Sequence, residues 1–483
     1  MAWTRAALGL IAAAAVVGVL VSGGSRADPR TPAALPGMPA PFLGTAVVGS
    51  GGLTAAIDAY GDVADLRAPG PAGPGLIENP AARQAAGTVP PTTGIVTRVA
   101  VDGGKPRPLW QADSVRQRYL RGTNVLRTEA RFGPVRVEIV TAVAGNTLER
   151  CVAVGGSGGR RAQIETSSNP SAAAVNCDGA AIRRSAAADR RWLAMARPLG
   201  ATAPAWAQRM YGRSLLALRA LTDRRTGAVA AGARDGWAYV WPRDAAAAAL
   251  AFSAAGCRAQ ARRIGRFLLA LNLDAAARFH GDGTPVAGRA AQGDAWGWTA
   301  LAAGATGLPP PPGHPAWRDR ADYQEKSTGD YVGDAIASGA LRPSGQLARR
   351  VGNPGSGWDT AAAWAVRPFA LRPLYPEARA ALHQALSREG RFGLVPSQDW
   401  PDRDPWTAPT AWSAWSLAAL GERRQALKLM GDLRRAATPA GLLPERVDAR
   451  TGIPTSTTPL AWSHAFAVLA LRQLWPNRPR PTK

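Results

Sequence analysis

The sequence has few of the residues that build disulfide scaffolds or metal sites. Three cysteines and four histidines occur in 483 residues. Three cysteines cannot form a disulfide scaffold, and the paired Cys or His spacings of zinc sites are missing. We therefore expect no metal and no other cofactor. In an oxidising compartment Cys151 and Cys177 could pair, which would leave Cys257 as a buried, inert thiol in an apolar helical context.

Acidic residues are also scarce, because 34 Asp and Glu face 58 Lys and Arg, for a formal net charge of +24. This excess suggests a nucleic-acid partner, since clustered basic side chains bind phosphates. The arginines are nevertheless scattered in pairs such as Arg160-Arg161 and Arg262-Arg263, without a helix-turn-helix, zinc-finger or RNP-like pattern. We expect no nucleic-acid partner. We favour a basic surface that loosely attracts anionic cell-wall polymers or lipid headgroups.

A long hydrophobic run is found only near the N-terminus. Arg5 precedes the uncharged apolar residues 6–21, and small residues then lead to a plausible cleavage site at Ser25-Arg26-Ala27. The run is shorter than the ~20 residues that span a bilayer. We therefore predict that residues 1–27 are a cleaved export signal, with a membrane anchor as the alternative. The mature protein is expected to be secreted or associated with the cell envelope.

The first half of the chain has the pattern of strands. Apolar residues at 46% and charged residues at 19% indicate a globular protein, and the length favours more than one domain. Residues 28–50 are rich in Pro and Gly and are predicted to form an extension. Within residues 51–190, runs such as 53–57, Gly94–Val101 and 135–141 alternate or carry β-branched residues between turn residues. They predict an antiparallel β-sandwich domain.

The second half of the chain has the pattern of helices. All 17 tryptophans except Trp3 and Trp110 lie at or after Trp192. Apolar residues recur there at steps of three and four, which predicts helices at 206–221, 244–255, 257–273, 360–371, 376–387, 411–420, 423–436 and 460–475. We expect residues 191–204 to be a linker and residues 205–483 to form a toroid of helix pairs, with the functional site in loops at one end.

Aromatic, basic and acidic side chains gather in a predicted loop at residues 235–244. Tyr239, Trp241, Arg243 and Asp244 lie together there, just ahead of an apolar helix. A pyranose needs such a set, because its C–H faces stack on aromatic rings while its hydroxyls take charged, directional hydrogen bonds. In the alternative interpretation Asp244 caps the helix, Arg243 pairs with Asp244, and the tryptophans pack in the core.

The Tyr-x-Trp-x-Arg-Asp pattern of this loop resembles the signature of glycoside hydrolase family 15, which includes glucoamylases, glucodextranases and some trehalases. Residues 211–223 resemble the family's first barrel helix, residues 292–294 a later motif, and residues 441–448 and 458–464 its last two. The motifs follow the family's order. The resemblance implies a multidomain chain with an N-terminal antiparallel β-sandwich followed by an (α/α)6 barrel, the same order that the strand and helix patterns predict.

The resemblance also implies which residues contact substrate. Trp241, Arg243 and Asp244 would bind the non-reducing terminal sugar, which makes the enzyme exo-acting. Further substrate contacts are expected at Tyr239, Gln292, Asp294, Trp296, Trp400 and Trp462. Core packing is the alternative for Trp296 and Trp400. His464 is expected to be a buried structural histidine.

Inverting hydrolysis needs an acid that protonates the departing oxygen and a carboxylate that activates water, with the two carboxyls ~6.5–9.5 Å apart. Glu445 stands where the family keeps its general base; a surface glutamate beside Arg446 is the alternative. Glu325 stands where the family keeps its general acid, although Gln324 replaces the tryptophan of relatives. The other candidates for the acid are Asp330, Asp334 and Glu377.

These residues together predict an exo-acting inverting glycoside hydrolase that releases terminal glucose from α-glucosidic oligo- or polysaccharides. The expected partner is an α-glucan or a related oligosaccharide, and the expected oligomeric state is a monomer. Because Gln324 departs from the family pattern, the alternative is a catalytically silent glycan-binding or cell-wall-associated protein on the same fold.

Overall fold

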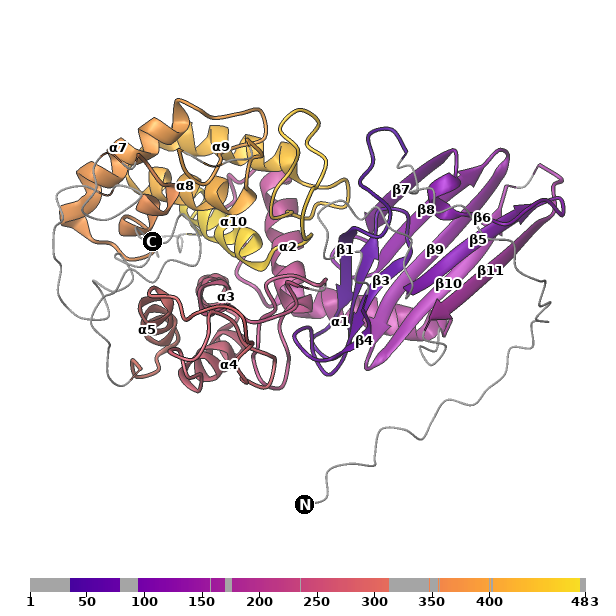
Figure 1. Cartoon of the computed structure of the whole chain (residues 1–483), viewed down its shortest axis with the longest axis horizontal. Helices are drawn as coiled ribbons and strands as arrows, with labels where there is room; N and C mark the ends of the chain where they lie inside the picture. The colour runs from indigo at the N-terminus through magenta and orange to yellow at the C-terminus, as the bar shows by residue number, and fades with distance from the viewer. Residues whose placement is uncertain are drawn as a thin grey trace, which may run out of the picture.

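The computed structural model describes residues 35–78, 94–156, 158–169, 176–234, 236–311, 347, 355, 357–398, 400 and 403–477. Antiparallel strands come first and helices follow, which confirms the predicted order (Figure 1). Within these ranges no helix is both long enough and apolar enough to cross a bilayer. The predicted export signal at residues 1–27 lies outside the described residues.

The strands form two antiparallel sheets. In the first, the order is β1-β2-β3-β5-β11, with β4 paired to β3 and β6 paired to β5; in the second, it is β10-β9-β8-β7. The first sheet consists of β1 (Gly44–Gly49), β2 (Thr54–Asp58), β3 (Val63–Arg67), β4 (Gly75–Ile77), β5 (Gly94–Val101), β6 (Arg107–Pro108) and β11 (Ala162–Asn169). The second consists of β7 (Ser114–Tyr119), β8 (Leu126–Phe132), β9 (Val135–Ala144) and β10 (Thr147–Gly155).

The two sheets pack face to face. Side chains of β8 and β9 alternate between buried and more exposed positions over most of their length, as expected when one face is covered. Val99 of the first sheet shares a buried cluster with Ala130 and Val137 of the second. The strand region also begins earlier than predicted, because β1 lies inside residues 28–50. Val47 and Val48 of that strand are fully buried, which an extension would not be.

A helix that the sequence did not predict ends the strand region. Helix α1 (Gly179–Ala194) packs against β9 and β10 and crosses the predicted boundary at residue 190 between the sandwich and the linker. Asp178 caps it by accepting a hydrogen bond of 2.7 Å from the backbone N–H of Ala180. A capping residue ahead of an alanine-rich segment was the available signal.

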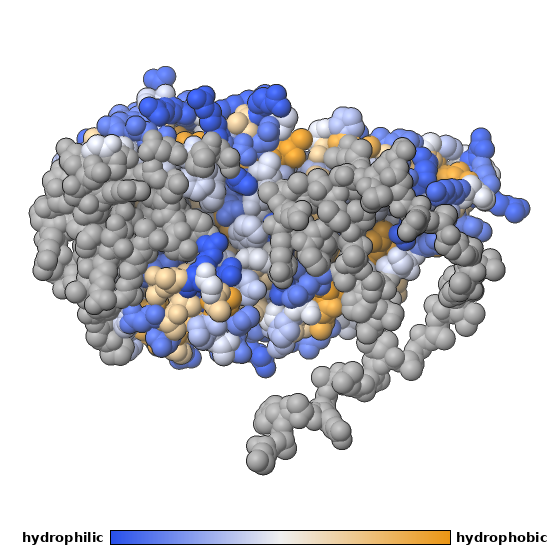
Figure 2. Space-filling view, viewed as in Figure 1, coloured by the Kyte–Doolittle hydropathy of each residue, from blue (hydrophilic) through white to orange (hydrophobic). Residues whose placement is uncertain are grey.

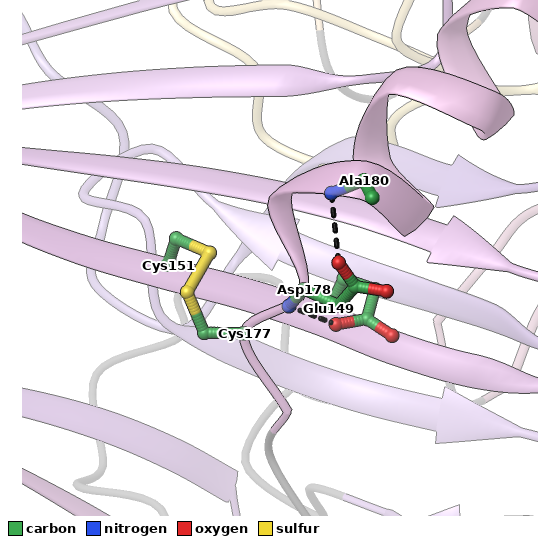
Figure 3. Close-up of a disulfide and its surroundings, with 5 residues drawn as sticks. All are labelled: Glu149, Cys151, Cys177, Asp178 and Ala180. Atoms are coloured by element: carbon green, nitrogen blue, oxygen red, sulfur yellow. Dashed lines mark hydrogen bonds between the residues drawn. A yellow bond between two sulfur atoms is a disulfide. The ribbon is translucent and has the colours of Figure 1, made fainter.

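A disulfide fixes the start of α1 to the sheet (Figure 3). It joins Cys151 of β10 to Cys177, so the pairing that the sequence allowed is present. The carboxylate of Glu149 accepts a 2.8 Å hydrogen bond from the backbone N–H of Asp178, next to the disulfide. Cys257 is a free thiol, and burial raises its pKa to about 11.

The helical region contains α2 (Ala205–Ala220), α3 (Pro242–Ala254), α4 (Arg258–Leu269), α5 (Ala295–Thr306), η4 (Thr360–Ala365), η5 (Arg372–Leu374), α7 (Tyr375–Leu386), α8 (Thr407–Ala419), α9 (Arg423–Ala436) and α10 (Ala461–Leu474). The predicted helix at 360–371 is only a 3-10 turn, η4, because Pro368 lacks the N–H that a continuing helix needs. Helix α5 was missed because it is apolar almost all round and has no amphipathic stripe.

Buried helices alternate with half-exposed ones along the chain. Helices α3, α8 and α10 are buried over most of their length, whereas α4 and α9 bury a single stripe. In α9 the buried side chains include Leu429 and Leu433, while Arg424, Lys428 and Arg434 are exposed. Figure 2 shows mainly hydrophilic residues along the edge where α7 and α9 lie. Buried helices therefore lie beside half-exposed ones, with α3 packed against α4 and α8 against α9.

One hydrophobic core crosses from the first sheet into the helical region. Val48 of β1 and Leu66 of β3 belong to the same buried cluster as Leu215 of α2 and Phe466 of α10. Asn124, in the turn before β8, strengthens this junction, because its side-chain amide donates 3.0 and 3.1 Å hydrogen bonds to carbonyls of α2 and β1. The first sheet therefore packs directly against the helical region and shares its core.

Candidate active site

A pocket lies at the N-terminal ends of the buried helices. Trp241 precedes the first residue of α3, Trp406 precedes α8, and Leu460 precedes α10. The residues that line it are Ala231, Trp237, Trp241, Arg243, Asp244, Trp406, Glu445, Leu460 and Trp462. Helix N-termini carry partial positive charge, so this end of the helical layer favours carboxylates and polar ligand groups. Aromatic rings, one guanidinium and two carboxyls share the pocket.

Arg243 is fixed in the pocket by a buried ion pair. Its guanidinium lies 2.6 Å from the carboxylate of Asp294, and the two side chains are 3% and 0% exposed. The guanidinium also lies over the rings of Trp462, at 4.9 Å from the centroid, and Trp364, at 5.5 Å. Asp294 therefore orients Arg243 from behind, although it does not itself line the pocket.

Asp244 is a buried carboxyl in the first turn of α3. Burial raises its pKa to about 7; Arg243 opposes this shift, and the nearby Glu445 and Asp294 add to it. Asp244 is not the capping residue, since α3 begins at Pro242 after Trp241, and Arg243 forms its ion pair with Asp294. The interpretation in which Asp244 caps the helix and pairs with Arg243 is therefore wrong. Near neutral pH this carboxyl can both donate and accept hydrogen bonds.

Glu445 lies in the pocket wall and is held at both carboxylate oxygens. The indole N–H of Trp237 donates to Oε1 at 3.2 Å, and the hydroxyl of Ser456 donates to Oε2. Its backbone N–H donates to the carbonyl of Thr457 at 2.9 Å, and its carbonyl accepts from the N–H of Thr407 at 3.0 Å. Glu445 is thus a fixed, half-buried carboxylate and not a solvated surface glutamate.

The other predicted substrate contacts do not line the pocket. Tyr239 packs edge-on against Trp241, with ring centroids 6.3 Å apart. Trp400 packs in the same way against Trp406, at 4.9 Å. Gln292, which is buried, and Trp296, which is half-buried, lie close in sequence to Asp294, next to the start of α5.

Four acidic residues were candidates for the general acid. Glu325, with Asp330 and Asp334, lies outside the described residues. Glu377, the remaining candidate, is on α7 and does not line the pocket. In the part of the chain that is described, no cluster of His, Cys, Asp and Glu side chains could hold a metal ion.

Two of the tryptophans that line the pocket, Trp237 and Trp406, were not predicted. Trp237 belongs to the same loop as Trp241, but no family motif points to it. Trp406 stands directly before α8, as Trp241 stands directly before α3. An aromatic residue at the entry to a buried helix was therefore a usable signal for Trp406.

A larger cleft, about 750 Å³ against about 40 Å³ for the candidate pocket, lies elsewhere in the described part of the chain, between α1, β9 and the helical region. Charged side chains that line it form ion pairs with one another, such as Arg219–Asp189 at 2.5 Å and Arg184–Asp178 at 3.3 Å. None of the predicted site residues lines this cleft. Its size alone does not make it the better candidate.

Comparison with solved structures identifies the fold. A bacterial glucoamylase in complex with acarbose aligns with a TM-score of 0.61 and 11% identity, over 94% of this chain and 96% of its own. A wild-type glycosidase aligns with a TM-score of 0.44 and 18% identity, over 56% of this chain and 96% of its own. A glucoamylase from Saccharomycopsis fibuligera aligns with a TM-score of 0.43 and 13% identity, over 56% and 94%. No protein-family model and no curated protein matches the sequence. The chain therefore shares the fold of the bacterial glucoamylase over nearly its whole length.

Proposed function

We propose that this protein is an exo-acting inverting glycoside hydrolase that releases terminal glucose from α-glucosidic oligo- or polysaccharides. The observation that carries the proposal is the pocket in which Glu445, Arg243 and Asp244 meet a wall of tryptophans. Such a set can stack on a pyranose, bind its hydroxyls and activate a water molecule. The bacterial glucoamylase of the same fold was solved with acarbose, which agrees with an oligosaccharide as the ligand.

In the proposed mechanism Glu445 is the general base. Its carboxylate would take a proton from the water that attacks the anomeric carbon, while the donors on Trp237 and Ser456 hold both oxygens in place. Arg243 and Asp244 would bind hydroxyls of the terminal sugar, and Trp241 and Trp462 would cover its apolar faces. Glu325 remains the proposed general acid on the strength of its sequence position.

The finer points of architecture and location are part of the same proposal. The alternation of buried and half-exposed helices supports an (α/α)6 barrel as the helical domain. An exported enzyme, secreted or held at the cell envelope, agrees with the disulfide between Cys151 and Cys177. We propose that it acts as a monomer and that its basic surface assists contact with cell-wall polymers or lipid headgroups.

The test is hydrolysis followed by proton NMR. The mature protein should release glucose as the β-anomer from maltooligosaccharides or isomaltooligosaccharides, or cleave trehalose, and Glu445→Gln should lose at least ~100-fold in kcat, as expected for removal of a general base. A matched control is Glu422→Gln, which alters an ion-paired glutamate next to α9, outside the pocket. Glucose released as the α-anomer would contradict the inverting mechanism. If no sugar is released while Glu445→Gln still binds glycans, the protein is the silent glycan-binding protein instead.

A further inference from the structure

His464 is a fully buried side chain in α10 that does not line the pocket. Its Nε2 lies 3.0 Å from the backbone nitrogen of Leu443, and its Nδ1 lies 2.9 Å from the hydroxyl oxygen of Ser214 on α2. A backbone N–H can only donate, so Nε2 must accept. The one hydrogen of a neutral imidazole then sits on Nδ1, where it donates to Ser214. The contacts of His464 therefore fix both its protonation state and its tautomer.

The surroundings of His464 keep the imidazole neutral. Burial and the nearby guanidinium of Arg213 lower its pKa to about 3. Arg213 is itself held from the other side, because it donates a 2.8 Å hydrogen bond to the carbonyl of Thr123 and lies 3.9 Å over the ring of Tyr119. Nε2 therefore keeps its lone pair for the N–H of Leu443 across the working pH range.

Leu443 begins the short segment that carries Glu445. The carbonyl of Leu443 accepts from the N–H of Leu460 at 3.0 Å, and the carbonyl of Pro444 accepts from the hydroxyl of Thr407. Together with the backbone contacts of Glu445, these bonds hold residues 443–445 between α8 and α10. The backbone N–H of Leu443 donates to Nε2 of His464, which ties this segment to the side chain of His464.

We propose that His464 is a positioning residue for Glu445: it accepts the N–H of Leu443, is oriented by Ser214, and thereby sets the depth at which the carboxylate enters the pocket. This inference rests on the proposed role of Glu445 as general base. Without an acceptor, the buried N–H of Leu443 would lose its partner and the segment would have to move, because an unsatisfied buried donor is unfavourable. A displacement of ~1 Å at a reacting group can lower a rate by ~100-fold.

The test compares two amides of similar polarity at position 464. In His464→Gln the side-chain oxygen reaches the place of Nε2 and can accept from Leu443, whereas in His464→Asn the shorter amide reaches only the place of Nδ1. We expect His464→Gln to keep kcat within roughly threefold, and His464→Asn to lower kcat by roughly 10- to 100-fold with little change in KM. Hydrogen exchange at the amide of Leu443 should be fast in His464→Asn and slow in His464→Gln. Leu471→Ala changes a buried residue of the same helix. It should lower Tm without lowering kcat and without speeding hydrogen exchange at Leu443.

Ser214→Ala provides a second variant in case His464→Asn does not fold. It removes the partner of Nδ1 and leaves the imidazole in place, so kcat should fall by roughly 2- to 10-fold and exchange at Leu443 should rise. Equal losses in His464→Gln and His464→Asn, or unchanged exchange at Leu443 in Ser214→Ala, would overturn the proposal. If the unmodified protein releases no glucose, the proposed function is contradicted. Hydrogen exchange would even then measure the bond between His464 and Leu443.

Discussion

The buried carboxyl of Asp244 should make stability depend on pH in a defined direction. Its pKa is raised from the ordinary value of 3.8 to about 7. Between these two values the unfolded chain ionises while the folded protein keeps the proton, so stability falls as pH rises and levels off above about pH 7. At about 1.36 kcal/mol per pKa unit, the full effect is about 4 kcal/mol. Asp244→Asn, which stays neutral, should therefore be more stable than the unmodified protein at pH 8 but not at pH 4.

Urea unfolding at pH 4, 6 and 8, followed by tryptophan fluorescence, measures this difference. Asp282→Asn is the control, because Asp282 lies in an exposed turn where hydrogen bonds from Thr284 lower its pKa. Relative to the unmodified protein, Asp282→Asn should have a lower free energy of unfolding at pH 8 than at pH 4. This pH dependence is opposite to that expected for Asp244→Asn. If the free energy of unfolding of Asp244→Asn differs from that of the unmodified protein by the same amount at pH 4 and pH 8, Asp244 does not carry a raised pKa and the reasoning is refuted.

Three further variants test other contacts of the structure. Trp237→Phe removes the N–H that donates to Glu445 and should lower kcat by roughly tenfold with little change in KM; an unchanged kcat would mean that this bond does not position the carboxylate. Arg243→Lys keeps the charge but loses the planar guanidinium, so it should raise KM for the oligosaccharide by at least roughly tenfold. If the variant and the unmodified protein bind the oligosaccharide equally well, Arg243 does not contact the sugar. Cys151→Ser removes the link to Cys177 over a separation of 26 residues, which should cost about 3.5 kcal/mol of unfolding free energy in urea; no change under oxidising conditions would count against the bond.

The strand region and most helices could be predicted from their residue patterns. β5 was predicted with its observed bounds, Gly94–Val101, and α9 with its observed bounds, Arg423–Ala436. The pattern of α9 is the one that a single covered face imposes, whereas β5 is buried at most positions on both faces and was recognisable from its β-branched residues. Helix α5 could not be predicted in this way, because a helix whose sequence is apolar nearly all round has no polar face to reveal its period.

From the residue types alone the site could be predicted only where several of them occur close together in sequence; Glu445 and Trp462, which also line the pocket, were predicted only through the resemblance to the family's last motifs. The loop that holds Trp241, Arg243 and Asp244 was found because aromatic and charged residues adjoin there. The ion pair between Arg243 and Asp294 joins residues 51 positions apart, and local spacing contains no information on which acid Arg243 meets. Similarly, Trp406 enters the pocket from a different helix, and only the fold brings it there.

The hydrophobic cluster that joins β1 and β3 to α2 and α10 determines how cooperatively the protein unfolds. Neither half can be separated without exposing apolar surface that the other half covers. The chain should therefore melt as a single unit in calorimetry and should not be divisible into two freely recombining modules. Loops at the pocket end can change without altering this shared core. Variation in substrate preference is thus expected to arise by changes in those loops and not by exchange of whole domains.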